Sequence, residues 1–171
     1  MKTHKKLILL LCVLVLATGG YYCIRRTERK ARVQESTGVF NLTDRTLDDL
    51  TGLSWTAEGK TRTFTLQDGQ WKAAEDSAEF SEDTDAAGTL AEQVVNLQAT
   101  RRIENVENLE EYGLTEPVVV VTAEWKNGST VYSMGVPTPF RDGYYLCLSG
   151  DRQTIYTIAF PLAAFGTAEN R

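Results

Sequence analysis

An uncharged and strongly apolar run near the amino terminus most constrains how this chain can fold. The run extends from Leu7 to Ile24, and its first part, to Ala17, is almost entirely Leu, Val and Ile. A helix over this run would be about 27 Å long, close to the roughly 30 Å hydrocarbon core of a bilayer. We therefore predict that residues 1–24 form a transmembrane signal anchor, with Tyr21 and Tyr22 at the headgroup level.

A cleaved signal peptide is the alternative interpretation of the same segment. In that case the small residues from Ala17 to Gly20 form the cleavage zone. A dense basic patch after the apolar run favours the anchor, because such a patch suits the membrane surface. Its members are candidate contacts to anionic lipid headgroups: Arg25, Arg26, Arg29, Lys30 and Arg32. A lipoprotein is excluded, because neither Cys12 nor Cys23 follows a small residue.

The orientation in the membrane stays open at this point. Counting Lys and Arg on both sides of the apolar run weakly favours a domain in the cytoplasm. The order of basic tip, apolar run and small residues is instead typical of an export signal. We predict a single-pass protein whose domain lies outside the cytoplasm, with a cytoplasm-facing scaffold as the alternative.

The charge of the chain is divided unevenly. Residues 1–32 contain eight Lys or Arg and one Glu, whereas residues 33–171 contain ten Lys or Arg and twenty-two Asp or Glu. Affinity for nucleic acid comes largely from Lys and Arg that neutralise phosphates, so the acidic part excludes a nucleic-acid partner. Cys147 is the one cysteine beyond the apolar run, so the domain forms no internal disulfide.

The pattern after the apolar run predicts a tether followed by a domain. Residues 25–38 are polar without apolar periodicity and read as a basic juxtamembrane tether, and residues 39–171 read as the domain. Short segments of alternating apolar and polar residues, separated by turns such as Glu58-Gly59 and Asn127-Gly128, indicate antiparallel hairpins. The predicted strands cover residues 53–56, 63–66, 70–73, 118–125, 130–134, 143–148 and 154–158.

One helix interrupts these strands. Apolar residues at three- and four-residue spacing predict an amphipathic helix from Thr84 to Ala99. A single helical turn follows at residues 108–113, which Asn108 caps and Gly113 closes in the left-handed conformation. The residues that define this second motif are Tyr112, Gly113, Leu114 and Pro117. The fold class is therefore α+β: a mostly antiparallel sheet of about six or seven strands with one main helix, preceded by the transmembrane helix.

Little in the domain suggests catalysis or metal binding. The only histidine, His4, lies in the basic tip, which excludes a Ser–His–Asp or Cys–His site in the domain and removes most zinc sites. The carboxylates around Asp83-Thr84-Asp85 do not have the spacing of an EF-hand loop. We predict no catalytic, cofactor or metal-binding residues. Trp55, Trp71 and Trp125 are expected in the core, whereas Tyr144 and Tyr145 point to opposite faces of one strand, so that one ring is exposed as a candidate interaction surface.

The order of several motifs resembles a bacterial family known only as domain of unknown function 4340. The motifs are Leu53-Ser54-Trp55, Phe64-Thr65-Leu66, Asp68-Gly69, Trp71, the Leu90/Val94/Leu97 helix, Ala99-Thr100-Arg101-Arg102-Ile103, Tyr112-Gly113-Leu114 with Pro117, Gly135, Tyr144-Tyr145 and Ile155-Tyr156. The resemblance covers about residues 50 to 160. It implies a membrane-anchored, envelope-facing module, in some members near gliding-type ABC transport components, and it carries no catalytic residue.

These observations lead to two functional hypotheses. The first is a non-catalytic, membrane-anchored interaction or assembly module with a protein partner in the cell envelope, in a role accessory to an ABC-type transport or gliding-type system. The second is a carboxylate-dependent hydrolase of envelope polymers, which requires two carboxylates facing each other across one cleft.

Overall fold

The computed structural model describes residues 34–75, 77 and 83–162. The chain divides into two compact units, Met1–Gln34 and Glu35–Arg171, and the second unit is the domain described below. The predicted transmembrane helix and the five basic residues after it lie outside the described residues, so they stay predictions. Among the described residues, no helix is long and apolar enough to cross a membrane.

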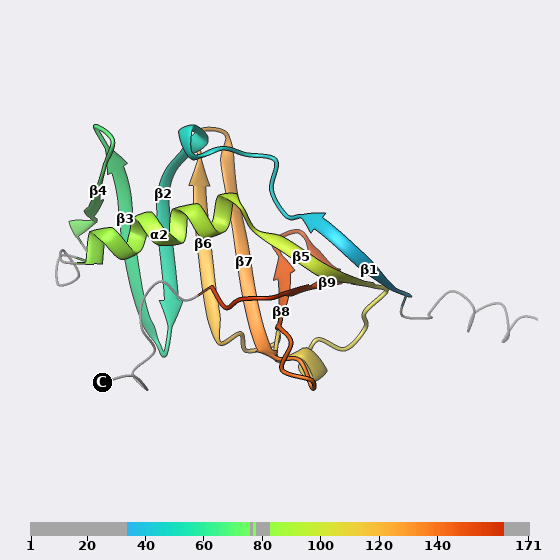
Figure 1. Ribbon diagram of the computed structural model, residues 1–171. Coiled ribbons are helices and arrows are strands. Elements are labelled where there is room, and N and C mark those ends of the chain that lie inside the picture. The colour runs from blue at the N-terminus through green and yellow to red at the C-terminus, as the bar shows by residue number, and fades with distance from the viewer. Residues whose placement is uncertain (1–33, 76, 78–82, 163–171) are drawn as a thin grey trace, which may run out of the picture. The chain divides into compact units, whose positions relative to one another are not determined.

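The domain contains one nine-stranded sheet in the order β1-β5-β9-β8-β7-β6-β2-β3-β4 (Figure 1). The strands are β1 (Gln34–Asn41), β2 (Leu50–Ala57), β3 (Lys60–Gln67), β4 (Gln70–Ala73), β5 (Gln98–Glu104), β6 (Val119–Trp125), β7 (Gly128–Pro137), β8 (Tyr144–Leu148) and β9 (Asp151–Ile158). The pairs from β5 across to β4 are antiparallel. The α+β class with a mostly antiparallel sheet is confirmed.

The predicted hairpins form where the turn residues require. Glu58 and Gly59 both have positive φ, 51° and 73°, and connect Ala57 to its partner Lys60. Such a two-residue turn matches the right-handed twist of the paired strands. The β6–β7 hairpin closes differently: Trp125 pairs with Gly128 across Lys126 and Asn127, and the positive φ (95°) is at Gly128 itself.

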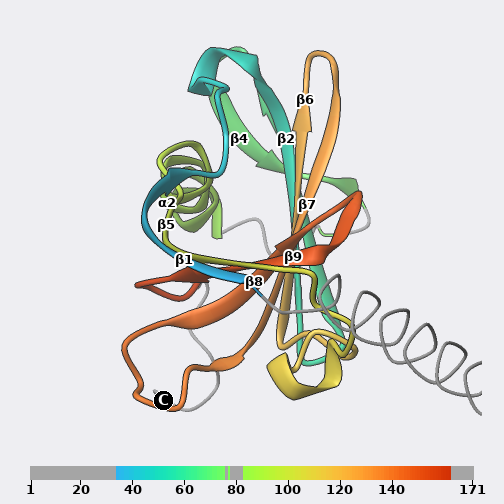
Figure 2. The ribbon, with the colours of Figure 1, turned by 90° about the vertical axis from the view of Figure 1, so that its right-hand side faces the viewer.

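A helix covers one face of the sheet. Helix α2 (Thr84–Val95) buries Ala87, Leu90, Ala91 and Val94, and it packs against β4, β2 and the short 3-10 helix η1 (Leu47–Asp49). Figure 2 shows α2 to one side of the sheet. The core beneath it includes Leu53, Trp55 and Phe64, each no more than 3% exposed.

A smaller apolar cluster lies away from this core. Its buried members are Ile103, Val106, Leu114, Cys147 and Ile155. Along β8, alternate side chains join different clusters: Tyr144, Leu146 and Leu148 pack with the main core, whereas Tyr145 and Cys147 pack with the smaller cluster. The sheet is therefore apolar on both faces in this region, and α2 covers only one of them.

The prediction of six or seven strands is wrong, because β1 and β5 were missed. β1 is an edge strand whose side chains are mostly exposed, so its sequence lacks the apolar alternation that marks a half-buried strand. It begins at Gln34 and therefore takes residues 34–38 from the predicted tether. β5 carries Arg101 and Arg102 at its centre, and its pairing with β9 shifts register between Ala99 and Arg101.

The predicted helix is also too long, because α2 ends at Val95 and not at Ala99. The Asn96 side chain donates a hydrogen bond to the Glu92 carbonyl (3.0 Å), which satisfies one of the free carbonyls of the last turn. Leu97 is still buried, but it is buried after the helix has ended, as the chain enters β5. The three- and four-residue spacing of apolar residues therefore extends to Leu97, although the helix itself ends at Val95.

Candidate interaction surface

The predicted single turn forms and packs tightly against β7. The 3-10 helix η3 (Glu110–Tyr112) begins where Asn108 Oδ1 accepts a hydrogen bond from the Glu110 N–H (3.0 Å). It ends at Gly113, whose φ of 65° is left-handed, and Leu114 after it is 2% exposed. A Cβ on Gly135 would lie 2.1 Å from the Tyr112 carbonyl oxygen. The backbone of η3 therefore rests directly on β7, a contact that only glycine at position 135 allows.

Pro117 and the residue after it fix the start of β6. The Val118 N–H donates to the Met134 carbonyl (2.8 Å), and Val119 pairs with Met134. Pro117 has no N–H to donate and cannot continue a helix, so the chain passes from η3 into the strand. Gly113 thus closes the turn and Leu114 is buried beside it, while Pro117 lies between the turn and β6.

Two tyrosines bring η3 and β8 together. The rings of Tyr112 and Tyr145 meet edge to face, with centroids 4.9 Å apart and planes at 89°. This geometry places the positive edge of one ring against the negative face of the other. Burial raises the pKa of both phenols, so both stay neutral at physiological pH. Tyr145 therefore anchors η3 to the sheet rather than projecting into solvent.

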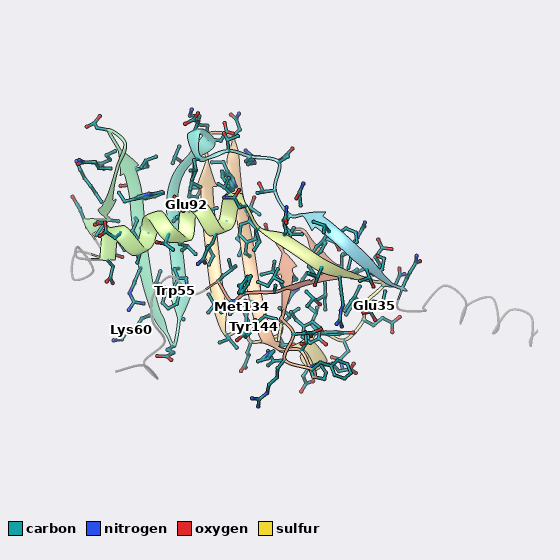
Figure 3. The ribbon with its side chains drawn as sticks, viewed as in Figure 1. Glu35, Trp55, Lys60, Glu92, Met134 and Tyr144 are labelled. Atoms are coloured by element: carbon teal, nitrogen blue, oxygen red, sulfur yellow. The ribbon has the colours of Figure 1, made fainter. Side chains whose placement is uncertain are left out.

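Tyr144 points to the opposite face of β8, as predicted. Figure 3 shows it near Met134, and both residues belong to the main core. Tyr144 and Tyr145 are each half-buried. The prediction that one of the two rings is exposed is therefore wrong: each face of β8 has its own apolar cluster, and each cluster covers one ring.

A charged bridge lies beside the tyrosine pair. Arg101 on β5 forms an ion pair with Asp142, and its guanidinium also lies 3.8 Å from a carboxylate oxygen of Glu35 on β1. Thr157 on β9 pairs with both Arg101 and Tyr145 in the sheet, so Arg101 and Tyr145 share one face. The bridge thus connects β5 to the loop before β8.

The same aspartate braces the loop between β7 and β8, residues 138–143. The Thr138 hydroxyl donates to Asp142 Oδ1 (2.5 Å), the Asp142 N–H donates to Thr138 Oγ1 (3.2 Å), and the Thr138 N–H donates to the Gly143 carbonyl (2.9 Å). The hydrogen bond from Thr138 and the charge of Arg101 hold the pKa of Asp142 below its ordinary value. Asp142 is therefore ionised, and the loop has a fixed shape.

This braced loop presents an aromatic ring to solvent. Phe140 is 83% exposed, and it lies between Thr138 and Asp142. Val118, just before β6, and Val136, near the end of β7, are 50% and 38% exposed at the same end of the sheet. We call Val118, Val136 and Phe140 the loop-end surface. Sequence reasoning missed it, because single apolar residues in a Pro-rich loop carry no periodic signal.

The described residues also form two hollows. The first is a groove of about 540 Å³ between β4 and α2, lined by Gln70, Trp71, Thr84, Asp85, Gly88, Thr89 and Glu92. The second is a more apolar cleft of about 420 Å³, where the end of α2 meets the ends of β5 and β9. Trp71 is half-buried in the first hollow, whereas Trp55 and Trp125 are buried in the core as predicted.

The carboxylates of the groove bear on the hydrolase hypothesis. Asp85 and Glu92 both belong to α2, so both carboxylates line the same side of the groove. Acid and base catalysis on a glycosidic bond requires two carboxyl groups that flank the bond. Among the described residues, no such facing pair lines either hollow, and no group of three or more His, Cys, Asp or Glu could hold a metal ion.

Cys147 is a buried residue of the smaller cluster. It is 7% exposed, and burial raises the pKa of its thiol. A thiol held in its neutral form inside an apolar cluster is a poor nucleophile. The thiol therefore packs as a small apolar side chain.

Comparison with known proteins identifies a family. Residues 71–169 match the model of a domain of unknown function (DUF4340). The match starts later than the resemblance from residue 50 and leaves the β2–β3 hairpin outside it. No curated protein and no solved structure matches the chain. Because the matched residues make up more than half of the chain, the protein belongs to the DUF4340 family of domains of unknown function.

Proposed function

We propose that this chain is a non-catalytic interaction module of the cell envelope. In this proposal the amino-terminal segment anchors it in the membrane, and the domain lies outside the cytoplasm, where the loop-end surface binds a protein partner. A role accessory to an ABC-type transport or gliding-type system belongs to the proposal, since that is the setting that the family resemblance implies.

The apolar run supports the membrane part of the proposal. Residues 7–24 are uncharged and long enough for a bilayer, and the basic residues after them suit anionic headgroups. The acidic character of the remaining chain keeps the domain away from anionic lipid, because like charges repel. A domain of this kind is free to meet a protein partner rather than lie on the membrane surface.

The exposure of Phe140 on a braced loop is the observation that carries the interaction part. Most exposed apolar side chains need no explanation, but here hydrogen bonds and an ion pair hold the loop in one shape. A partner would therefore lose little free energy in ordering the loop on binding. Aromatic side chains presented in this way are frequent centres of binding energy in protein interfaces.

Site-specific crosslinking tests this proposal. A photo-crosslinking residue at position 136, in the full chain in its native membrane, is expected to form one discrete protein adduct. Phe140→Ser in the same chain should reduce the adduct about tenfold, the effect of losing one aromatic anchor. Phe160→Ser is the matched control. Phe160 is as exposed as Phe140, at 82%, but it lines the cleft at the ends of α2, β5 and β9 and is not part of the loop-end surface.

The control variant should leave the adduct unchanged. An adduct that persists in Phe140→Ser, or that falls equally in both variants, would contradict a docking role for the loop-end surface. An adduct with the mass of two copies of this chain would show that the loop-end surface binds a second copy of the chain, and would contradict the proposed envelope partner.

A further inference from the structure

The groove between β4 and α2 has a floor and one charged wall. Trp71 on β4 lies against the helix beside Gly88: a Cβ there would be 3.7 Å from Trp71 Cδ1, an ordinary contact distance. Asp85 and Glu92 line the groove from α2, with Thr89 between them. A half-buried indole beside two carboxylates is the arrangement that attracts a positively charged group.

No Lys or Arg is among the described residues that line the groove with the two carboxylates. Neither Asp85 nor Glu92 forms an ion pair within the described part of the chain, whereas nearby Asp83 is paired with Arg62 at 3.3 Å. No Lys or Arg occurs in the sequence from residue 73 to residue 100. Lys72 neighbours Trp71 on β4, but it is not among the described residues that line the groove.

The backbone beside the groove can pair with another chain. β4 is the last strand in the sheet order, so among the described residues it has a sheet neighbour only on its β3 side. Figure 1 shows β4 at this edge with α2 crossing next to it. An edge strand presents unpaired N–H and C=O groups, to which an extended segment can add as a further strand.

From these features we propose that the β4–α2 groove binds an extended, cationic segment of a partner protein. The segment pairs with the free edge of β4, and its Lys or Arg side chains enter the groove between the Trp71 indole and the carboxylates of Asp85 and Glu92. This site is separate from the loop-end surface, so the proposal stands independently of the docking proposed there.

A defined peptide tests the site. The full chain in nanodiscs of zwitterionic lipid is titrated with a short fluorescent peptide in which Lys alternates with Thr, so that alternate side chains share one face. Binding is expected to be saturable and to weaken as salt is raised. The double variant Asp85→Asn/Glu92→Gln should weaken binding about tenfold, the effect expected for two exposed ion pairs.

The matched control removes the same charge elsewhere. Asp44→Asn/Asp48→Asn lowers the negative charge by the same amount at two exposed positions outside the groove, and binding should stay within about twofold of wild type. Trp71→Leu should weaken binding through loss of the cation–π contact.

Three outcomes would overturn the proposal. Equal loss in the groove and control variants would mean that only net charge matters. Equal affinity for a peptide with Glu in place of Lys would exclude recognition of positive charge. Binding of a neutral oligosaccharide that depends on Trp71 but not on the two carboxylates would assign the groove to glycan instead.

Discussion

Replacing Gly135 with Ala is expected to destabilise the protein by about 3 kcal/mol, near the upper end of the range for overpacking. The new Cβ would lie 2.1 Å from the Tyr112 carbonyl oxygen and 3.2 Å from Gly113 backbone atoms, so η3 must move as a unit. That movement would also disturb the edge-to-face contact of Tyr112 with Tyr145. In thermal unfolding, the loss corresponds to a decrease in Tm of about 10 °C.

Gly88→Ala is the matched control for this substitution. Gly88 lies inside α2, and its added Cβ would be 3.7 Å from Trp71, an ordinary contact distance. Ala should therefore raise the free energy of unfolding by about 0.5–1 kcal/mol, because glycine costs backbone entropy in a helix. If both variants changed Tm in the same direction, the close packing of η3 on β7 would not be the cause.

Phe64→Ala is expected to have the larger effect, a loss of about 3–5 kcal/mol. Phe64 is 1% exposed and lies opposite Leu53 in the β2–β3 pair, so the substitution leaves a cavity in the main core. Because this loss approaches the whole stability of a small domain, the variant can unfold outright. Phe64→Leu keeps most of the volume and should cost about 1.5 kcal/mol or less in urea unfolding.

Phe140→Ala is the matched control for Phe64→Ala, because it removes the same side chain at an exposed position. Phe140 is 83% exposed, so its loss should change the free energy of unfolding by no more than about 0.5 kcal/mol. A large loss in Phe140→Ala would show that the ring is packed rather than presented. Such a result would remove the reason for proposing the loop-end surface as a docking site.

The parts of the fold that could be predicted are those in which local sequence and tertiary contacts agree. The Glu58-Gly59 turn and the left-handed Gly113 need backbone conformations that their residue types favour, so the sequence indicates them directly. Strand β1 could not be found in this way, because an edge strand with exposed side chains has no apolar alternation. β5 was missed because its pairing with β9, rather than its composition, holds Arg101 and Arg102 in a strand.

The candidate sites were less predictable than the fold, for a similar reason. The loop-end surface depends on an ion pair between Arg101 and Asp142, which are 41 residues apart in the chain. The β4–α2 groove depends on Trp71 meeting Gly88, a contact that exists only once α2 has packed on the sheet. Tyr144 and Tyr145 were correctly assigned to opposite faces, but sequence could not show that both faces are covered.

Our central claim, that the domain is held at a membrane and lies outside the cytoplasm, can be measured with an accessible thiol. Gln67→Cys places a thiol at an exposed position of β3, in a chain whose Cys12 and Cys23 are replaced by Ala and whose buried Cys147 remains as an internal control. We predict that the protein stays in the membrane fraction and that a membrane-impermeant maleimide labels it in intact spheroplasts. Recovery without detergent in the soluble cytosolic fraction, or labelling only after permeabilisation, would contradict the account.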